Sequence, residues 1–398
     1  MSCIDTHAEL LRARAHTDAL FDLVAERSLY DRPVAERHRL IFYVGHVDTF
    51  DWNQIARGVL GEASFHPTFD RLFEAGIDPP PGQAPQDKPG DWPSLNEVRA
   101  YVKRTRDRLD ELWAEAPAER QQVALEHRWM HAETLCYLLH RLRFSQKRRP
   151  VPTAEADAPP ASHAPLDVPA GRATLGQRTG AFGWDNEFPS HQVDVPAFTI
   201  DRHKVTNADY LRFVADGGPV PPFWREREGR WWLLRMFEEV PLPPDEPVYA
   251  THRQASDYAQ WASASLPTEA QWHRAAYGDS SLAYPWGDHE PEGGLGNFDF
   301  VAWDSVAVTA HPASASAVGA EQMVGNGWEW TSTPFAGFDG FAPSSYYPGY
   351  SANFFDDDHW VLKGGSPRTA RCLLRRSFRN WFRGDYPFAY TTFRLVRP

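Results

Sequence analysis

The segment from Gln121 to Leu142, QQVALEHRWMHAETLCYLLHRL, decides how the first half of this chain folds. Its apolar residues recur at the spacing of an amphipathic helix. His127 and His131 lie four residues apart, so one helix face presents both imidazoles. Met130 lies mostly on that face, whereas Glu133 is turned away from it. The spacing therefore predicts a long helix whose inner face offers two nitrogen ligands to one metal ion.

Three further helical patterns precede this segment. They run from Thr6 to Val24, from Arg37 to Leu60 and from Ser94 to Trp113. The segment between Phe65 and Trp92 is rich in proline, which predicts a long connection rather than a helix. Four amphipathic helices favour a four-helix bundle over residues 1–150.

The second half of the chain has a different pattern. Residues 151–170 hold five prolines and neither Lys nor Arg, which predicts an interdomain linker. From 171 to 398, short apolar runs such as Gln192–Ile200 are separated by Gly, Asn and Pro. Helical spacing is confined to Asn207–Ala215, Gln254–Ala262 and Glu269–Tyr277. These features predict an irregular α+β domain with aromatic side chains in its core.

Length and composition exclude several classes of function. The 398 residues are enough for two domains, and the formal net charge of −12 argues against sequence-independent binding to nucleic acid. No stretch approaches the length of an apolar membrane span, and the first residues lack the layout of a signal peptide. The three cysteines are too far apart for a CxxC pair or a disulfide framework. We therefore expect a cytoplasmic protein that acts on small molecules.

A third metal ligand is predicted at His46, within the apolar run Ile41–Trp52. A buried histidine needs a partner, and His46 occupies the counterpart helix. Three neutral imidazoles leave up to three positions open on an octahedral ion, as chemistry on a substrate and oxygen requires. Zinc is the main competitor, because three histidines also hold a zinc ion for hydrolysis. A lone HxxxH pair is often structural, so residue types alone leave these possibilities open.

Five motifs of the second half resemble the formylglycine-generating-enzyme-like, or sulfatase-modifying-factor, fold. In chain order they are Val205–Phe213, Leu266–Trp272, Gly325–Trp330, Lys363–Ser366 and Phe393–Arg394. The resemblance spans nearly all of 170–398 and implies an irregular α+β domain related to C-type lectins. Glu329 and Trp330 are expected to be architectural, fixing a loop crossing or a structural calcium ion. The copper-dependent formylglycine activity is not expected, because it uses a C-terminal cysteine pair and only Cys372 is present.

The first half resembles a DinB-type bundle with its histidine triad, and the combination is similar to the iron-dependent sulfoxide synthases of ergothioneine biosynthesis. Phe182–Pro189 and Arg379-Asn380-Trp381 are further features of that family. The resemblance implies that His46, His127 and His131 hold Fe(II). It also implies that the enzyme uses O2 to join hercynine, the trimethylated histidine betaine, to a thiol, with a sulfoxide as product.

The resemblance also suggests residues that bind the substrates. A quaternary ammonium cannot donate a hydrogen bond and needs an aromatic or soft uncharged wall, which Trp381 and Met130 can supply. Asn380 is expected to donate its amide to the substrate carboxylate. Arg368 and Arg379 are candidate carboxylate partners, since bidentate pairing favours arginine. The alternatives are ordinary packing for Met130, a turn amide and a core indole at 380–381, and solvated charges on a surface strand for the arginines.

A tyrosine hydroxyl is the usual proton or electron donor in such a site. Tyr101, Tyr346 and Tyr347 are the candidates, with Tyr101 as a simple core residue the alternative.

The sulfur donor follows from a missing residue. Relatives that use γ-glutamylcysteine carry an arginine before a proline ahead of the third helix, where this chain has Asp91-Trp92-Pro93. The clamp for a second carboxylate is therefore absent, and cysteine is the preferred donor. Three rival interpretations remain: a selenoneine synthase that joins a selenosugar to hercynine, a non-catalytic metal-binding or ligand-binding module, and a zinc hydrolase or thiol transferase.

Overall fold

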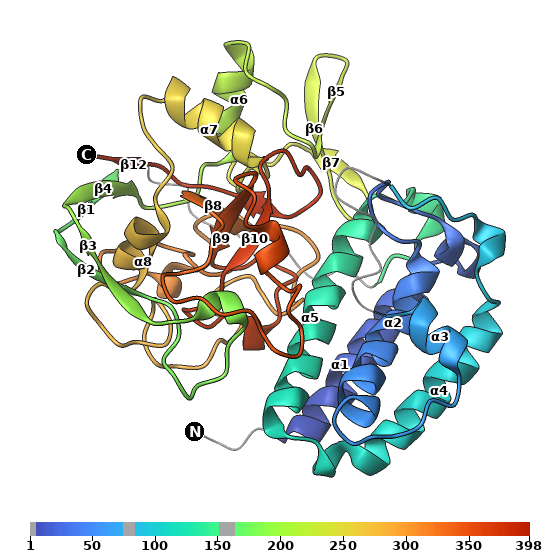
Figure 1. Cartoon of the computed structure of the whole chain (residues 1–398). Helices are drawn as coiled ribbons and strands as arrows, with labels where there is room; N and C mark the ends of the chain where they lie inside the picture. Colours follow the sequence, from blue (N-terminus) through green and yellow to red (C-terminus); the bar gives the residue numbers. More distant parts are fainter. Residues whose placement is uncertain (1–4, 75–83, 151–163) are drawn as a thin grey trace. The chain divides into compact units, whose positions relative to one another are not determined.

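A computed structural model describes residues 5–74, 84–150 and 164–398. The chain divides into two compact units, Met1–Pro152 and Thr153–Pro398. The N-terminal unit is helical and the C-terminal unit combines short sheets with three α-helices, which confirms the predicted mixed architecture (Figure 1).

Four long helices build the N-terminal unit and confirm the predicted bundle. They are α1 (Thr6–Asp22), α2 (Leu40–Asp51), α4 (Leu95–Leu112) and α5 (Ala118–His140), and a π-helical turn, Trp52–Arg57, extends α2. The side chain of Asp5 caps α1, and a Ser94–Glu97 capping box begins α4. In the described residues α1 packs on α5, and α2 packs on both α4 and α5. The two predicted metal-bearing helices are therefore neighbours.

The bundle is closed at one end by an apolar cluster in which Trp52, Leu109, Trp113 and Leu125 are buried. Short 3-10 helices lie between the long ones at Glu26–Tyr30, Pro89–Asp91 and Trp113–Glu115, and another follows α5 at Phe144–Gln146.

The predicted connection between Phe65 and Trp92 is wrong in one part. It contains the helix α3 (Pro67–Leu72), with the ring of His66 accepting a hydrogen bond from the Phe69 N–H at its start. Pro67 occupies the first turn, where a proline loses no helical hydrogen bond. The proline that argued against a helix thus begins one. Residues 75–83, which hold three of the prolines, lie outside the described residues.

Within residues 164–398, the C-terminal unit contains four small sheets, and Figure 1 shows their strands among the loops of this unit. The first has the order β1 (Pro165–Val168), β4 (Phe198–Asp201), β12 (Val396–Arg397), and the second pairs β2 (Gly171–Leu175) with β3 (His191–Val195). The third has the order β5 (Trp224–Arg227), β6 (Arg230–Leu234), β7 (Glu239–Pro241). The fourth has the order β10 (Asn380–Arg383), β9 (His359–Lys363), β8 (Trp328–Pro334), β11 (Thr391–Thr392), in which β11 is parallel to β8.

Three helices accompany these sheets and confirm the helical predictions for this half. They are α6 (Asn207–Ala215), α7 (His252–Trp261) and α8 (Glu269–Tyr277), each begun by a threonine capping box. Further 3-10 helices lie at Asp185–Glu187, Pro312–Ser314, Ala352–Phe354 and Arg371–Leu373.

The predicted linker extends too far toward the C-terminus. Pro165 and the residues after it form β1, which pairs antiparallel with β4, so residues 165–168 belong to a sheet. Proline is tolerated there because Pro165 is the first residue of a strand at the sheet edge. Residues 151–163, which hold the other candidate linker positions, lie outside the described residues.

A buried charge cluster ties the ends of the C-terminal unit together. The Glu329 carboxylate on β8 accepts from Lys204 Nζ at 2.6 Å, from Arg394 at 2.7 and 2.8 Å and from the Trp272 indole at 3.1 Å. Burial alone would raise the pKa of Glu329, but Arg394 and Lys204 hold it below its ordinary value. Both carboxylate oxygens are occupied by protein donors, which confirms the architectural role predicted for Glu329.

A second buried group makes the stability of this unit sensitive to acid. His252 at the start of α7 stacks on Trp360 with ring centroids 4.0 Å apart and donates from Nε2 to the Thr331 carbonyl at 3.1 Å. Burial lowers its pKa to about 4. Because the folded pKa lies below the unfolded value near 6.5, this contribution is complete above pH 6.5 and is lost as the pH falls toward 4.

Replacing His252 by phenylalanine keeps the stack and removes the titration. Between pH 7.5 and 4.5 we expect the wild type to lose about 2–3 kcal/mol more unfolding free energy than His252→Phe. Urea unfolding followed by tryptophan fluorescence at both pH values measures this difference. An equal loss in the two proteins would contradict the prediction.

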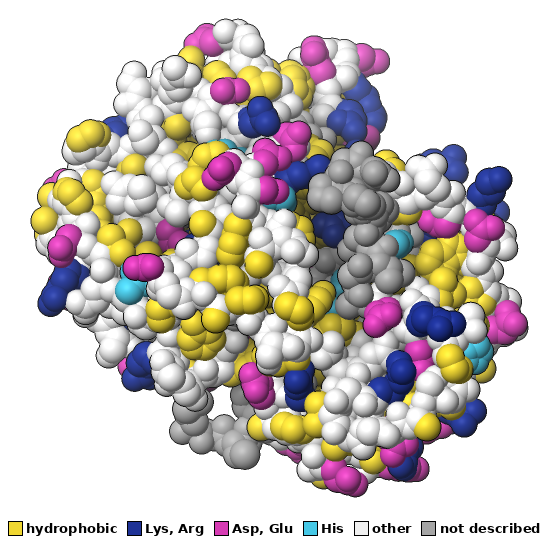
Figure 2. Space-filling view, viewed as in Figure 1, with side chains coloured by type: hydrophobic (Ala, Val, Ile, Leu, Met, Phe, Trp, Pro, Cys, Tyr) yellow, Lys and Arg dark blue, Asp and Glu magenta, His cyan; other side chains and the backbone are white. Residues whose placement is uncertain are grey.

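The helices of the described residues are either too short or too polar to cross a bilayer. On the face shown in Figure 2, Lys and Arg side chains are interspersed with Asp and Glu rather than gathered in one broad patch. This pattern agrees with the net negative charge and offers no nucleic-acid footprint on that face.

Candidate metal centre

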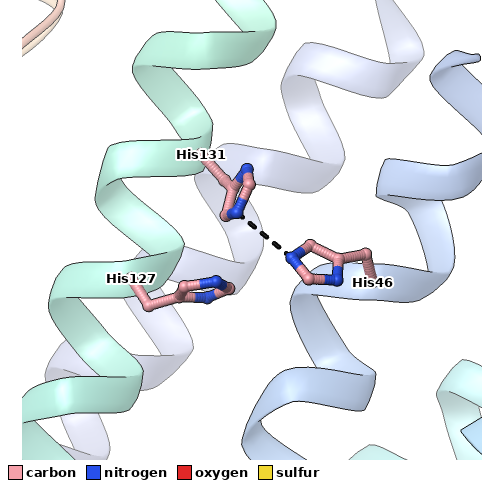
Figure 3. A group of neighbouring side chains, drawn as sticks. All are labelled: His46, His127 and His131. Atoms are coloured by element: carbon pink, nitrogen blue, oxygen red, sulfur yellow. Dashed lines mark hydrogen bonds between the residues drawn. The ribbon is translucent and has the colours of Figure 1, made fainter. Parts of the chain in front are cut away.

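Three histidines from two helices of the N-terminal unit converge. His46 lies on α2, and His127 and His131 lie one turn apart on α5 (Figure 3). One nitrogen from each ring lies within 4.8 Å of the others. His46 and His127 are each only 3% exposed, and His131 is half-buried. The structure thus brings together the three residues that the sequence nominated as ligands.

A backbone carbonyl orients the His46 ring. Nδ1 of His46 lies 2.8 Å from the carbonyl oxygen of Phe73, which can only accept, so Nδ1 carries the proton. The lone pair of His46 is therefore on Nε2, which points at Nε2 of His131 at 3.1 Å. A hydrogen bond of this kind from the remote nitrogen is what fixes the tautomer of metal-binding histidines.

The spacing of these two nitrogens suits a shared ion. Two ligand nitrogens about 2.1 Å from one ion lie about 3.0 Å apart when they meet at a right angle, and about 3.4 Å apart in a tetrahedron. The 3.1 Å between His46 Nε2 and His131 Nε2 is closer to the right-angled arrangement, which leaves room for further ligands on the opposite side.

His127 supplies the second sign of a ligand site. Its ring stacks on Phe50 with centroids 3.4 Å apart, and neither of its nitrogens has a hydrogen-bond partner in the described chain. Burial, then the nearby His131 and His46, lower its pKa well below the ordinary value, so the ring is neutral. A buried, neutral and unpartnered imidazole beside two others is the chemical form that a metal ion requires. The residues present therefore fit a bound metal.

A buried ionic network holds α2 against α5 beside these ligands. Arg128, next to His127, donates to the Val47 carbonyl at 2.9 Å, to Asp48 at 2.6 Å and to Asp51 at 2.8 Å. All three charged side chains are fully buried. This network could not be predicted from the sequence, because only the tertiary structure selects the carboxylates that lie within reach of Arg128.

Tyr101 lies in the same unit but is committed to other partners. Its hydroxyl donates to Asp70 at 2.7 Å and accepts from Thr49 at 3.3 Å. Burial and the Asp70 carboxylate raise the pKa of Tyr101 above its ordinary value, against the opposite effect of the Thr49 hydrogen bond. The predicted catalytic role of Tyr101 stays a prediction, and its contacts favour the alternative of a core residue that supports α2 and α3.

Asn380 and Trp381 lie on β10 of the C-terminal unit. Asn380 accepts from the Trp381 N–H through its side-chain oxygen at 2.9 Å, so its amide nitrogen is the end that can donate to a ligand. The Trp381 indole stacks on Phe335 at 4.3 Å and contacts the edge of Tyr350 at 5.3 Å. Both residues are half-buried, so Trp381 combines a rigid aromatic setting with an accessible part.

The remaining predicted substrate residues have distinct surroundings. Met130 on α5 is half-buried. Tyr346 and Tyr347 are half-buried in a loop whose backbone N–H groups donate to Ser344, and the Tyr347 ring lies 5.7 Å from Tyr350. Tyr347 thus joins the aromatic group that includes Trp381. Their proposed roles remain predictions.

The two predicted arginines differ from each other. Arg379 is paired with Glu269 at 3.0 Å and donates to the carbonyls of Asn186 and Ala336. Arg368 is 0% exposed and has no hydrogen-bond partner for any side-chain nitrogen in the described chain. Both are buried, so the alternative of solvated surface charges is wrong. The contacts of Arg379 favour a structural role, whereas the Arg368 guanidinium contacts the Trp303 ring without making a hydrogen bond to the described residues.

Comparison with known proteins agrees with this division of the chain. Residues 9–144 match the DinB superfamily, and residues 152–398 match the sulfatase-modifying factor enzyme 1-like domain. The hercynine oxygenase of Mycolicibacterium smegmatis is 37% identical over 76% of this chain and 77% of that protein. The hercynine oxygenase of Mycobacterium tuberculosis is 41% identical over 54% of this chain and 55% of that protein.

Ergothioneine biosynthesis protein 1 of Neurospora crassa is 25% identical over 94% of this chain, which spans about half of that longer protein. Both halves of the chain thus match a family model, and two of these relatives are similar to this chain across most of its length. With its histidine triad in place on the bundle, the chain belongs to the sulfoxide synthase family of ergothioneine biosynthesis.

Proposed function

We propose that this protein is an Fe(II)- and O2-dependent enzyme that joins the imidazole carbon of hercynine to the sulfur of cysteine and yields the sulfoxide. The observation that carries the proposal is the group of three converging imidazoles, the buried His46 and His127 and the half-buried His131, in a chain of this family. The reaction balances as hercynine plus cysteine plus O2 giving the hercynyl cysteine sulfoxide plus water.

The bundle residues prepare the metal site. His46 presents a lone pair because its proton is held by the Phe73 carbonyl, and His127 stays neutral because it is buried. Bound iron supplies the activation of O2 and a meeting point for the reactants. Three histidine ligands without a carboxylate leave room for both substrates and oxygen, which supports iron over a closed structural zinc site.

Residues of the C-terminal unit bind the betaine in this proposal. The Trp381 indole offers its π-face to the trimethylammonium group of hercynine. This group has no N–H, so it cannot donate a hydrogen bond to the protein. Phe335 keeps the indole in place from the other side. The Asn380 amide nitrogen donates to the hercynine carboxylate, with its orientation fixed by the Trp381 N–H. Tyr347, near this aromatic group, is our preferred proton donor among the three candidate tyrosines.

Reconstitution tests this function directly. Protein loaded anaerobically with Fe(II), then given hercynine, cysteine and O2, is expected to form a conjugate carrying one added oxygen, with one O2 consumed per product. Mass spectrometry with ¹⁸O2 measures the incorporated atom. Zn(II)-loaded protein is the control and should form none. Hydrolysis or thiol transfer without O2 uptake would overturn the proposal.

Parallel reactions with other donors assign the sulfur source. We expect cysteine to exceed γ-glutamylcysteine, because Asp91-Trp92-Pro93 offers no arginine for a second carboxylate. A selenosugar that outcompetes cysteine would replace the donor assignment and leave the metal assignment intact.

A further inference from the structure

Arg368 is the exception among the buried arginines of the C-terminal unit. Arg274, Arg379 and Arg394 each donate to carbonyls and to a carboxylate through short hydrogen bonds. Arg368 is buried as deeply as any of them, at 0% exposure. Yet Nε, Nη1 and Nη2 all lack a hydrogen-bond partner within the residues that the structure describes. The fold satisfies every other buried guanidinium of this unit and leaves this one open.

An open buried guanidinium is unfavourable, because its desolvation is not compensated by any hydrogen bond. Arginine also stays charged at all accessible pH values, so it cannot relieve the penalty by losing a proton. Such a group is tolerated where an anionic ligand completes it. Arg368 is therefore a candidate ligand-binding residue on energetic grounds alone.

The backbone around Arg368 is held rigidly. The Arg368 N–H donates to the Ser366 hydroxyl at 3.0 Å, and the flanking carbonyls of Pro367 and Thr369 accept from Phe300 and Asp299 at 3.0 and 2.8 Å. The guanidinium lies 4.2 Å from the Trp303 ring, which stacks on one of its faces. The planar guanidinium is thus fixed in orientation, and a ligand would bind at its N–H edges.

An acidic residue, Asp304, directly follows Trp303, whose ring contacts this guanidinium. Asp304 accepts from the Met236 N–H through Oδ1 at 3.0 Å, which leaves Oδ2 for a ligand. Burial raises the pKa of Asp304, and Arg368 is the strongest influence that lowers it, so the two groups share one environment. No ion pair within 4.0 Å joins them in the described chain. Trp303 and Asp304 are half-buried, so both neighbours of Arg368 are partly accessible to solvent.

We propose that Arg368 binds the α-carboxylate of the sulfur donor and that Asp304 accepts from its α-ammonium group, so that the pair recognises a free amino acid. This inference rests on the proposed function. A buried cation and a half-buried carboxyl group that form no ion pair with each other match a zwitterion, with each charge of the ligand completing one side chain.

The same pairing disfavours the other ligands of the reaction. The trimethylammonium group of hercynine has no N–H to donate and gains little from Asp304. A sugar donor has no carboxylate and would leave the guanidinium open. Arg368 therefore distinguishes an amino-acid donor from a sugar donor, which the metal site alone does not.

Arg368→Met is the central variant, with Arg368→Lys as its conservative partner. The matched control is Arg371→Met, three residues further on, which breaks an exposed ion pair to Asp299 at 2.6 Å outside the proposed site. We expect Arg368→Met to melt at the same temperature as wild type or higher, because it removes a buried guanidinium that has no hydrogen-bond partner. A clearly lower melting temperature would show that Arg368 serves the fold through Asp304, and would overturn the proposal.

Binding of cysteine to the metal-free protein, measured anaerobically by calorimetry, needs neither iron nor turnover. We expect Arg368→Met to weaken it at least about tenfold, Arg368→Lys less, and Arg371→Met not at all. Cysteamine, which lacks the carboxylate, should bind all four proteins alike. Equal losses for cysteine and cysteamine would overturn the proposal.

In the Fe(II) enzyme, Arg368→Met should raise the KM for cysteine at least about tenfold and leave the KM for hercynine unchanged. A rise in the KM for hercynine instead would show that Arg368 binds hercynine rather than the sulfur donor, and would overturn the assignment. Absence of any product in wild type would defeat the proposed function, whereas the calorimetric result would still decide whether Arg368 binds an amino acid.

Discussion

Replacing His131 by alanine is expected to abolish retention of iron and all O2-dependent product formation. His131 Nε2 lies 3.1 Å from His46 Nε2, and its removal leaves two of the three imidazole ligands. Loss of a partner that only orients a ligand already costs roughly 10–100-fold in metal affinity, so loss of a ligand should cost more than about 100-fold. Metal analysis after gel filtration should give about one iron per wild-type chain and close to none for the variant.

The matched control is His140→Ala, which removes another buried histidine of α5 outside the triad and should keep its iron. The C-terminal unit should remain folded in His131→Ala, because the two units have separate cores and His131 lies in the first. Stoichiometric iron in His131→Ala would show that the metal is bound elsewhere and would remove the basis of the proposed function.

Much of the fold could be predicted because it depends on periodicity and capping. The four bundle helices and α6 to α8 have regular apolar spacing and clear N-terminal signals, such as Ser94 with Glu97. The helix at Pro67 was missed because proline breaks a helix in its interior but favours one in its first turn. Residues 165–168 were wrongly predicted as linker, because their surroundings are rich in proline and the partner of this strand, β4, lies about thirty residues further along the chain.

The candidate site could likewise be predicted only in part from the sequence. The HxxxH spacing and the apolar run around His46 pointed to the three ligands. The carbonyl of Phe73 that orients His46 could not be predicted, because every residue has a carbonyl and only the tertiary structure selects one. The absence of hydrogen bonds to the Arg368 guanidinium could not be predicted either, since the sequence shows five arginines from 368 to 379 and does not show which of them the fold pairs.

Replacing Arg128 by methionine is expected to destabilise the bundle by about 3–5 kcal/mol, the usual cost of breaking a buried charge pair on one side. Arg128 is the neighbour of His127 and bridges α5 to Asp48 and Asp51 of α2. Asp48 keeps Arg106 as a bidentate partner at 2.9 and 3.0 Å. Asp51 loses the one cation within ion-pair distance in the described bundle. Thermal or urea unfolding measures the loss.

A second substitution separates the cost of leaving the Asp51 carboxylate without its partner from the cost of lost packing. Burial already raises the pKa of Asp51 to about 6 even with Arg128 present, so without Arg128 the carboxyl can stay buried only by taking up a proton. Arg128→Met combined with Asp51→Asn removes that need, and we expect it to regain at least half of the lost stability. If the double variant is no more stable than Arg128→Met, the cost arises from lost packing rather than from the stranded carboxylate.

The double variant also tests whether Arg128 sets the geometry of the metal site. Arg128 also donates to the Val47 carbonyl, one residue from His46, so it fixes the α2 backbone against α5 next to two of the ligands. Methionine restores volume without this bond. We therefore expect the double variant to regain stability but to hold iron more weakly than wild type, whereas equal iron affinity would show that core packing alone sets the distance between the two ligand helices.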